Sequence, residues 1–326
     1  MSKISIKCFD VALQPKVRSL RLLSFLLSRP WGVVLVQKIF RWFKGKEIKG
    51  LVCEERFIPS RNNGPDIRIR IFRPKTKEAL PAMLYIHGGG YLVGLPELSL
   101  YTIKKYIETR PCIIIAPDYR KGLKHGYPDG FNDCYDTLLW MKENYTSLGM
   151  LSDRFVVSGH SAGGGLAAAV TLKACDTRAV NIAFQMPIYP MLDYRQKTSS
   201  AKEMGDGVPV WNSKSNALGW KTYLQHCNGT VPPYASVALA DDLSHLPPTI
   251  TFVGELEPFK DETIEYVEAL KKANISVKFA LFPKAFHAFE QLVKHADVAK
   301  KANAFHLEAW GAFYDLYLIN RSDSSG

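Results

Sequence analysis

The sequence feature that most constrains the fold is a glycine-flanked serine between a strand-like run and a helix-like run. Residues 155–165 read FVVSGHSAGGG, so Ser161 lies in the pattern G-x-S-x-G directly after an apolar run. An alanine-rich stretch of helical composition follows from Ala162 to Ala174. The small residues allow a tight strand-to-helix turn, which projects the serine hydroxyl from the edge of a sheet. This context favours a nucleophilic serine over a chance occurrence of the pattern.

A second glycine cluster, His87-Gly-Gly-Gly-Tyr91, stands earlier in the chain at the end of another apolar run. Consecutive glycines leave their backbone N–H groups unhindered. We expect the amides of Gly89, Gly90 and Ala162 to form an oxyanion hole. Of the three consecutive glycines, Gly88 is the one that we expect to be replaceable. Individual donors of this kind are typically worth about 3 to 4 kcal/mol of transition-state stabilisation.

Strand-like and helix-like segments alternate from Val52 onward, which predicts an α/β fold with a mostly parallel central sheet flanked by helices. Residues 66–74 alternate isoleucine with arginine, which predicts an antiparallel, half-solvated strand near a sheet edge. The alternation lapses between Pro190 and Pro248, and we expect a cap insertion there at about residues 190–235. The expected buried strands are Met83–Ile86, Cys112–Ala116, Phe155–Val157, Asn181–Met186 and Ile250–Val253, and the expected helices are Asp129–Tyr145, Ala162–Ala174, Asp261–Ala273 and Asp297–Leu318.

Composition narrows the class of protein. The 326 residues are 47% hydrophobic and 22% charged, which is typical of a globular chain and excludes a disordered one. The six cysteines contain no C-x-x-C pair, and no Cys/His cluster has zinc-ligand spacing. We therefore expect reduced thiols, no metal site and a cytoplasmic location.

The net charge of +11 is concentrated at the N-terminus. Residues 1–50 contain eleven Lys or Arg against Asp10 and Glu47, so the remainder of the chain is nearly neutral. No nucleic-acid-binding motif accompanies these cations, and we expect no nucleic-acid partner.

The same N-terminal segment predicts two apolar helices separated at Arg29-Pro30, because proline ends the first of them. Neither is long enough to span a bilayer, and Arg29 interrupts the apolar core that a signal peptide would need. Residues 1–50 are therefore expected to form a helical cap segment ahead of the main domain, residues 51–326. Two compatible interpretations stay open: a lid packed on the protein, or a peripheral contact with an anionic membrane surface.

Taken together, these motifs resemble the hormone-sensitive-lipase-like branch of the α/β-hydrolase carboxylesterases, over most of the chain. The resemblance implies an α/β-hydrolase fold, no cofactor, a nucleophile-acid-histidine order along the chain, and a cap made of N-terminal helices and an insertion. Monomers and homodimers both occur in such a family. Besides HGGGY and GHSAGGG, the matching segments are Asp118-Tyr-Arg120, Tyr127-Pro128 with Asp133, residues 189–193, Pro233-Tyr-Ala-Ser236, Leu246-Pro-Pro248 and Phe286-His-Ala-Phe289.

The rest of a catalytic triad is expected late in the chain. A serine needs a base within hydrogen-bond reach, and His287, in the segment AFHAF after an apolar strand, matches the histidine loop of the family. The family usually has aspartate directly before a proline where this chain has Glu257, and we assign Glu257 to orient the imidazole. Asp261 is the second candidate for the acid and Glu255 the third. His160, directly before the serine, also departs from the family, where an acidic residue or threonine is common.

The predicted function is hydrolysis of short- to medium-chain acyl esters through an acyl-enzyme intermediate, with a small-molecule ester as the substrate. We expect acyl preference to be set by the cap, around Trp31, Trp42, Met204 and Trp211. Amide or carbamate hydrolysis is a neighbouring activity. The alternatives are a non-catalytic ligand-binding member of the fold and a membrane-surface-associated lipase or deacetylase.

Overall fold

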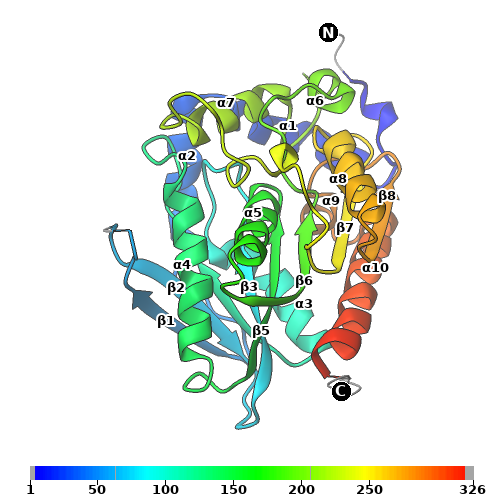
Figure 1. Cartoon of the computed structure of the whole chain (residues 1–326). Helices are drawn as coiled ribbons and strands as arrows, with labels where there is room; N and C mark the ends of the chain where they lie inside the picture. Colours follow the sequence, from blue (N-terminus) through cyan, green and yellow to red (C-terminus); the bar gives the residue numbers. More distant parts are fainter. Residues whose placement is uncertain (1–3, 63, 206, 320–326) are drawn as a thin grey trace.

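The computed structural model describes residues 4–62, 64–205 and 207–319, built around an eight-stranded sheet in the order β1-β2-β4-β3-β5-β6-β7-β8 (Figure 1). β1 and β2 run antiparallel to their neighbours, and the strands from β4 to β8 in this order are parallel. The predicted fold class is thus confirmed. The strands are β1 (Val52–Ile58), β2 (Ile67–Arg73), β3 (Leu80–Ile86), β4 (Ile113–Pro117), β5 (Met150–His160), β6 (Asn181–Ile188), β7 (Thr249–Gly254) and β8 (Val277–Phe282).

Helices cover both faces of the sheet (Figure 1). Leu84 and Ile86 of β3 belong to one core, with residues of α4, α5 and α8, whereas Met83 and Tyr85 belong to a second, with residues of α3 and α10. This two-sided burial explains why the central strands are continuous apolar runs. The α-helices are α1 (Gln14–Leu27), α2 (Pro30–Phe40), α3 (Leu100–Thr109), α4 (Asp129–Asn144), α5 (Ala162–Asp176), α6 (Ser199–Glu203), α7 (Ser213–Tyr223), α8 (Lys260–Lys272), α9 (Phe289–Leu292) and α10 (Asp297–Tyr314). Short 3-10 helices form at η1 (Ile6–Cys8), η2 (Arg41–Phe43), η3 (Pro96–Ser99) and η4 (Val237–Leu239), and η5 (Asp315–Ile319) is a π-helix that continues α10.

Strand β2 corrects one expectation. It is antiparallel and second from the sheet edge, as predicted, but its arginines are not solvated: Arg68 and Arg70 are 5% and 3% exposed. Both guanidinium groups pair with the buried carboxylate of Glu97, and Arg68 also pairs with Asp118 at 3.1 Å. A buried charge is tolerated when it is paired and hydrogen-bonded, so alternation of apolar and charged residues did not indicate a solvated face here.

The N-terminal helices lie together with α6 and α7 over the carboxyl ends of the parallel strands (Figure 1). The helix break at Arg29-Pro30 is as predicted. Three hydrogen bonds join α1 to the region between β6 and β7: Arg21 Nε to the Gly207 carbonyl at 2.7 Å, Val210 N–H to the Leu20 carbonyl at 3.1 Å, and Ser215 Oγ to the Ser24 carbonyl at 3.1 Å.

Within the described ranges, no single helix has the length and apolar composition to cross a membrane. Residues 14–27 and 30–43 satisfy those criteria only as a pair, which is bent by 113° at the junction.

Candidate active site

Ser161 lies in the turn between β5 and α5, with φ 60° and ψ −124°. Such a conformation is unfavourable for a residue with a side chain and is typical of a nucleophile elbow. The turn is held by a hydrogen bond from the Ser161 N–H to the Ile188 carbonyl at 2.9 Å. A Cβ at Gly163 would lie 2.2 Å from the Ile86 carbonyl oxygen, so glycine is required for α5 to approach β3 this closely.

His287 lies between Ser161 and Glu257 and forms a hydrogen bond through each ring nitrogen. Its Nε2 is 2.8 Å from Ser161 Oγ, and its Nδ1 contacts Oε2 of Glu257. The other carboxylate oxygen of Glu257 accepts the Gly254 N–H at 2.8 Å. Because His287 follows β8 and Glu257 follows the adjacent strand β7, the parallel sheet brings both to the edge where Ser161 follows β5. The structure therefore joins the three residues that the sequence selected.

The other two candidate acids have different partners. Asp261 accepts the Ser200 N–H at 2.7 Å, and Glu255 accepts the Lys284 N–H at 2.8 Å. Neither carboxylate hydrogen bonds with His287 in the described part of the chain. Position therefore favours Glu257, which is fully buried.

The glycine loop after β3 lies beside the serine. Gly89 and Gly90 have φ values of 131° and 62°, which glycine adopts without strain. The N–H groups of Gly89, Gly90 and Ala162 donate to no hydrogen-bond acceptor among the residues described, and the same is true of Gly88. A Cβ at Gly90 would lie 1.9 Å from the indole of Trp211, so the cap insertion packs directly against this loop. These amides are thus available to an oxygen atom of a ligand.

Tyr119 packs against His87, the residue directly before the three glycines of the loop. The Tyr119 hydroxyl donates to the His87 carbonyl at 3.0 Å, and the two rings stack with centroids 4.4 Å apart. Burial, together with the nearby charge of Lys121, lowers the pKa of His87 to about 3, so the ring is neutral. The glycine loop is therefore positioned by the stacked rings of Tyr119 and a neutral His87.

Behind the triad lies a layer of buried polar side chains, and Glu290 and Tyr85 in it were not singled out from the sequence. Tyr189 donates to Glu290 Oε1 at 2.5 Å, and its ring makes an edge contact with His287 at 4.8 Å. Burial raises the pKa of Glu290 to about 7. His160, the unusual residue before the nucleophile, hydrogen bonds with Tyr85 at 3.1 Å, and burial lowers the pKa of its imidazole well below the usual range. The only sequence signal was that Glu290 closely follows His287.

A cavity of about 180 Å³ opens above Ser161 and His287. Its upper wall is hydrocarbon from the N-terminal helices, namely Leu23, Leu27 and Phe40. Of the four cap residues expected to set acyl preference, Trp211 lines this cavity. The side chains of the other three do not line it: Trp31 and Trp42 are 56% and 87% exposed, and Met204 is buried outside the lining. Leu27 and Phe40, which lie near the two tryptophans in the chain, line the cavity in their place. The residues of α1 and α2 that meet the cavity are leucine and phenylalanine, whereas Trp31 of α2 and Trp42 of η2 are exposed.

The described residues contain no group of three or more His, Cys, Asp or Glu side chains arranged to hold a metal ion. What they contain is a mostly parallel eight-stranded sheet with a serine on the central strand-to-helix turn and a histidine late in the chain. Fold and site together define the class of protein as an α/β hydrolase of the serine type.

Comparison with known proteins agrees with this class and narrows it. Residues 83–291 match the family described as alpha/beta hydrolase fold. The chain is 29% identical over 247 residues to carboxylesterase NlhH of Mycobacterium tuberculosis, covering 75% of this chain and 77% of the relative. It is 27% identical over 256 residues to an ethyl acetate hydrolase of Pseudomonas putida, covering 76% and 79%. A bacterial heroin esterase superposes with a TM-score of 0.87 at 31% identity, over 95% of this chain and 99% of the other.

The chain belongs to the hormone-sensitive-lipase-like family of α/β hydrolases. The family and enzyme class predicted from the sequence are thereby confirmed: it is a carboxylesterase-type hydrolase.

Proposed function

We propose that the protein hydrolyses carboxylic esters with Ser161 as the nucleophile, His287 as the general base and acid, and Glu257 as the residue that orients the imidazole. The observation that supports this most is the imidazole of His287, which hydrogen bonds with Ser161 Oγ at 2.8 Å on one side and with a buried carboxylate on the other. Glu257 holds the tautomer in which Nδ1 carries hydrogen, so that Nε2 is free to take the serine proton.

In the first half of the reaction, Ser161 Oγ attacks the ester carbonyl carbon while its proton passes to His287 Nε2. The oxyanion is stabilised by the amides of Gly89, Gly90 and Ala162. The expectation that Gly88 is replaceable was wrong, because a Cβ there would lie 2.8 Å from the His160 carbonyl oxygen. His287 then protonates the leaving alcohol as the C–O bond breaks, which leaves the acyl group on Ser161. Water, deprotonated by His287, attacks the acyl-enzyme, and the acid is released as Ser161 regains its proton.

We propose short- to medium-chain acyl groups as substrates. The cavity of about 180 Å³ has apolar walls, which suits a short hydrocarbon chain better than a long one. Residues 1–50 and the insertion at about 190–235 form the cap in this proposal, because Leu27, Phe40 and Trp211 line the cavity from those segments. The ethyl acetate hydrolase among the relatives supports small substrates. A cytoplasmic location stays part of this proposal.

The test is hydrolysis of p-nitrophenyl esters from acetate to dodecanoate by the wild type and by Ser161→Ala. We expect turnover that falls by at least about 10³-fold in the variant, with an optimum among the shorter chains. If the folded wild type shows no turnover above the variant on any ester, the non-catalytic ligand-binding alternative replaces this proposal. An optimum at dodecanoate would favour a lipase.

A second, compatible function rests on the outer face of the N-terminal helices. Trp31 and Trp42 are largely exposed there, with further exposed apolar side chains such as Leu35 and Ile39. The surrounding segment contains eleven of the cations and two acids. Exposed tryptophan beside lysine and arginine is typical of a helix that lies in an anionic membrane interface. We propose that this face makes peripheral contact with such a surface.

Vesicle sedimentation tests the membrane contact. The wild type should bind phosphatidylglycerol vesicles at low salt, bind them much less at high salt, and not bind phosphatidylcholine vesicles. Trp31→Ala/Trp42→Ala should lose most of the binding, whereas Leu151→Ala/Leu281→Ala, which removes two apolar side chains exposed elsewhere (48% and 41%), should not. Equal binding by both double variants would contradict the contact.

A further inference from the structure

A second concave site lies beside the catalytic cavity and has the opposite character. It is a groove of about 790 Å³ between α2–η2 and the loop of residues 118–125. Five cationic side chains line it against one carboxylate: Arg41, Lys44, Arg120, Lys121 and Lys124 against Asp118. The catalytic cavity, by contrast, is lined on its upper side by hydrocarbon. Cations gathered in a concave site focus a positive potential on whatever enters it.

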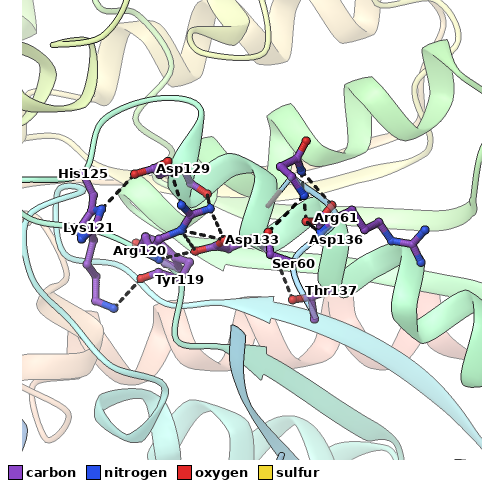
Figure 2. A network of polar contacts seen from close by, with 11 residues as sticks. Ser60, Arg61, Tyr119, Arg120, Lys121, His125, Asp129, Asp133, Asp136 and Thr137 are labelled. Carbon is purple, nitrogen blue, oxygen red and sulfur yellow. Dashed lines mark hydrogen bonds and ion pairs between the residues drawn. The ribbon is translucent and has the colours of Figure 1, made fainter. Parts of the chain in front are cut away.

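Part of this charge is already neutralised. Arg120 is held by Asp133 at 2.8 Å and Asp129 at 3.0 Å, in the polar network drawn in Figure 2. Lys121 pairs with Asp118 at 2.6 Å.

The other three cations, Arg41, Lys44 and Lys124, form no ion pair in the described part of the chain. All three are exposed. They are therefore available to an anion in the groove.

The walls of the groove are fixed to each other and to the glycine loop. Gln37 of α2 donates from Nε2 to the Leu92 carbonyl at 2.7 Å, and the Gly122 N–H donates to the Tyr91 carbonyl at 2.8 Å. A Cβ at Gly122 would lie 2.3 Å from Gln37 Nε2, so the 118–125 loop packs tightly on α2. In Figure 2, Arg120 and Asp133 anchor that loop to α4, and the Arg120 N–H donates to Asp133 at 2.7 Å. The groove is thus preformed, and binding there requires no rearrangement of its backbone.

The groove and the catalytic cavity are neighbours with a common wall. Phe40, Gly94 and Leu95 line both. The two sites are therefore adjacent, and a molecule whose ester carbonyl lies at Ser161 would have to pass Phe40 to reach the groove.

We propose that this groove, termed the anion groove, binds the negatively charged end, a carboxylate or phosphate, of an ester substrate whose scissile bond lies at Ser161. This rests on the proposed esterase function and deepens it. The substrate class is an anionic ester: an apolar part occupies the cavity under Leu23 and Leu27, and a charged end meets Arg41, Lys44 and Lys124. Each cation at an exposed site contributes a modest, salt-dependent attraction, and three acting on one anion give a measurable selectivity.

The test uses pairs of soluble esters that differ in one charge. Methyl hexanoate and monomethyl adipate place the anion on the acyl side, and hexyl acetate and 6-acetoxyhexanoate place it on the alcohol side. The quantity measured is the ratio of kcat/KM for the charged ester to that for its neutral partner, at low ionic strength and by acid release. In Arg41→Gln/Lys44→Gln/Lys124→Gln we expect this ratio to fall by about tenfold for at least one pair, a change of about 1.4 kcal/mol.

The matched control removes the same charge elsewhere. Lys271→Gln/Lys278→Gln/Lys301→Gln takes three exposed lysines from α8, β8 and α10, outside the groove, and should leave the ratio within about twofold of the wild type. If the two triple variants give the same ratio for both pairs and for the lipid pair below, the anion groove is not a substrate subsite. The neutral esters report the esterase function separately, because their turnover by the wild type must exceed that of Ser161→Ala whatever the groove does.

A lipid pair distinguishes the source of the anion. The hydrolysis of phosphatidylglycerol and of phosphatidylcholine in mixed detergent micelles is measured for the wild type and the two triple variants. If turnover of phosphatidylglycerol falls only because the triple variant no longer binds phosphatidylglycerol vesicles, the membrane contact proposed above explains the loss. A loss confined to phosphatidylglycerol with vesicle binding unchanged would identify a lipid headgroup as the occupant, and a loss confined to the soluble pairs would identify a free anionic ester. Either loss supports the proposal.

Discussion

On the sheet side of the catalytic cavity, Ser161, His287 and Glu257 are buried and hydrogen-bonded to one another. On the cap side, Leu23, Leu27 and Phe40 present only hydrocarbon. The sheet side follows from backbone geometry, since three parallel strands end at one edge and each delivers one side chain. The cap side comes from a segment at the other end of the chain, joined mainly by packing and a few hydrogen bonds. Chemistry and selectivity are thus assigned to regions that can be changed separately.

The largest effect is expected on the sheet side, for Glu257→Gln. The amide keeps the size of the side chain but favours the wrong tautomer of His287, so we expect kcat to fall by about 10³- to 10⁴-fold. Ester hydrolysis is the measurement, with the melting temperature as a check on folding. Asp261→Asn is the control, because Asp261 binds the Ser200 N–H, and it should change kcat by less than about threefold. Equal losses in both variants would remove Glu257 from the triad.

The next largest effect is expected where the two regions touch, at Gly90 and Trp211. In Gly90→Ala the new methyl group would lie 1.9 Å from the Trp211 ring, at a φ of 62°. We expect a displaced glycine loop and a loss of about 10²-fold in kcat/KM, comparable with the loss of one oxyanion donor. Activity should recover in part in Gly90→Ala/Trp211→Ala, because the clash is then removed. No recovery would mean that the backbone conformation at Gly90, not the cap, limits the loop.

The same division explains what the sequence could predict. Ser161, the glycine loop and His287 are recognisable because each stands at the end of a strand with a local pattern of small residues. Trp31 and Trp42 do not themselves line the cavity, although Leu27 and Phe40 near them do, because the sequence of an apolar segment does not specify which of its side chains meet the cavity. Glu290 was missed and the arginines of β2 were expected to be solvated, because the partners of these residues lie far away in the chain. Local backbone requirements are thus visible in the sequence, and long-range pairing is not.

The layer behind the triad predicts opposing effects of pH on stability. His306 of α10 belongs to this layer, since its ring lies 5.7 Å from that of His160. Burial lowers the pKa of His306 to about 3, so the unfolded chain takes up a proton below pH 6.5 that the folded chain does not, and stability falls as the pH falls from 6.5 towards 3. Burial raises the pKa of Glu290 to about 7 from 4.5. The folded chain therefore keeps a proton that the unfolded chain loses, and this contribution falls as the pH rises from 4.5 to 7.

Glu290→Gln removes the second of these effects. Relative to the wild type, the free energy of unfolding of the variant should increase by about 1.4 kcal/mol per pH unit between pH 4.5 and 7, as measured by urea unfolding at several pH values. Glu308→Gln, on the exposed side of α10, is the matched control and should show no such trend. A difference that does not depend on pH would show that the buried carboxyl stays ionised.

The smallest effect is expected at the cap, and it concerns selectivity only. Phe40 lies between the catalytic cavity and the anion groove, whereas its neighbour Ile39 points outward and is 50% exposed. Phe40→Ala should raise kcat/KM for p-nitrophenyl octanoate relative to acetate by about threefold to tenfold, because a wall of the cavity is removed, and Ile39→Ala should leave that ratio unchanged. If Phe40→Ala instead lowers turnover of both esters equally, the cap positions the catalytic residues as well. In that case the separation of chemistry from selectivity would not hold in this protein.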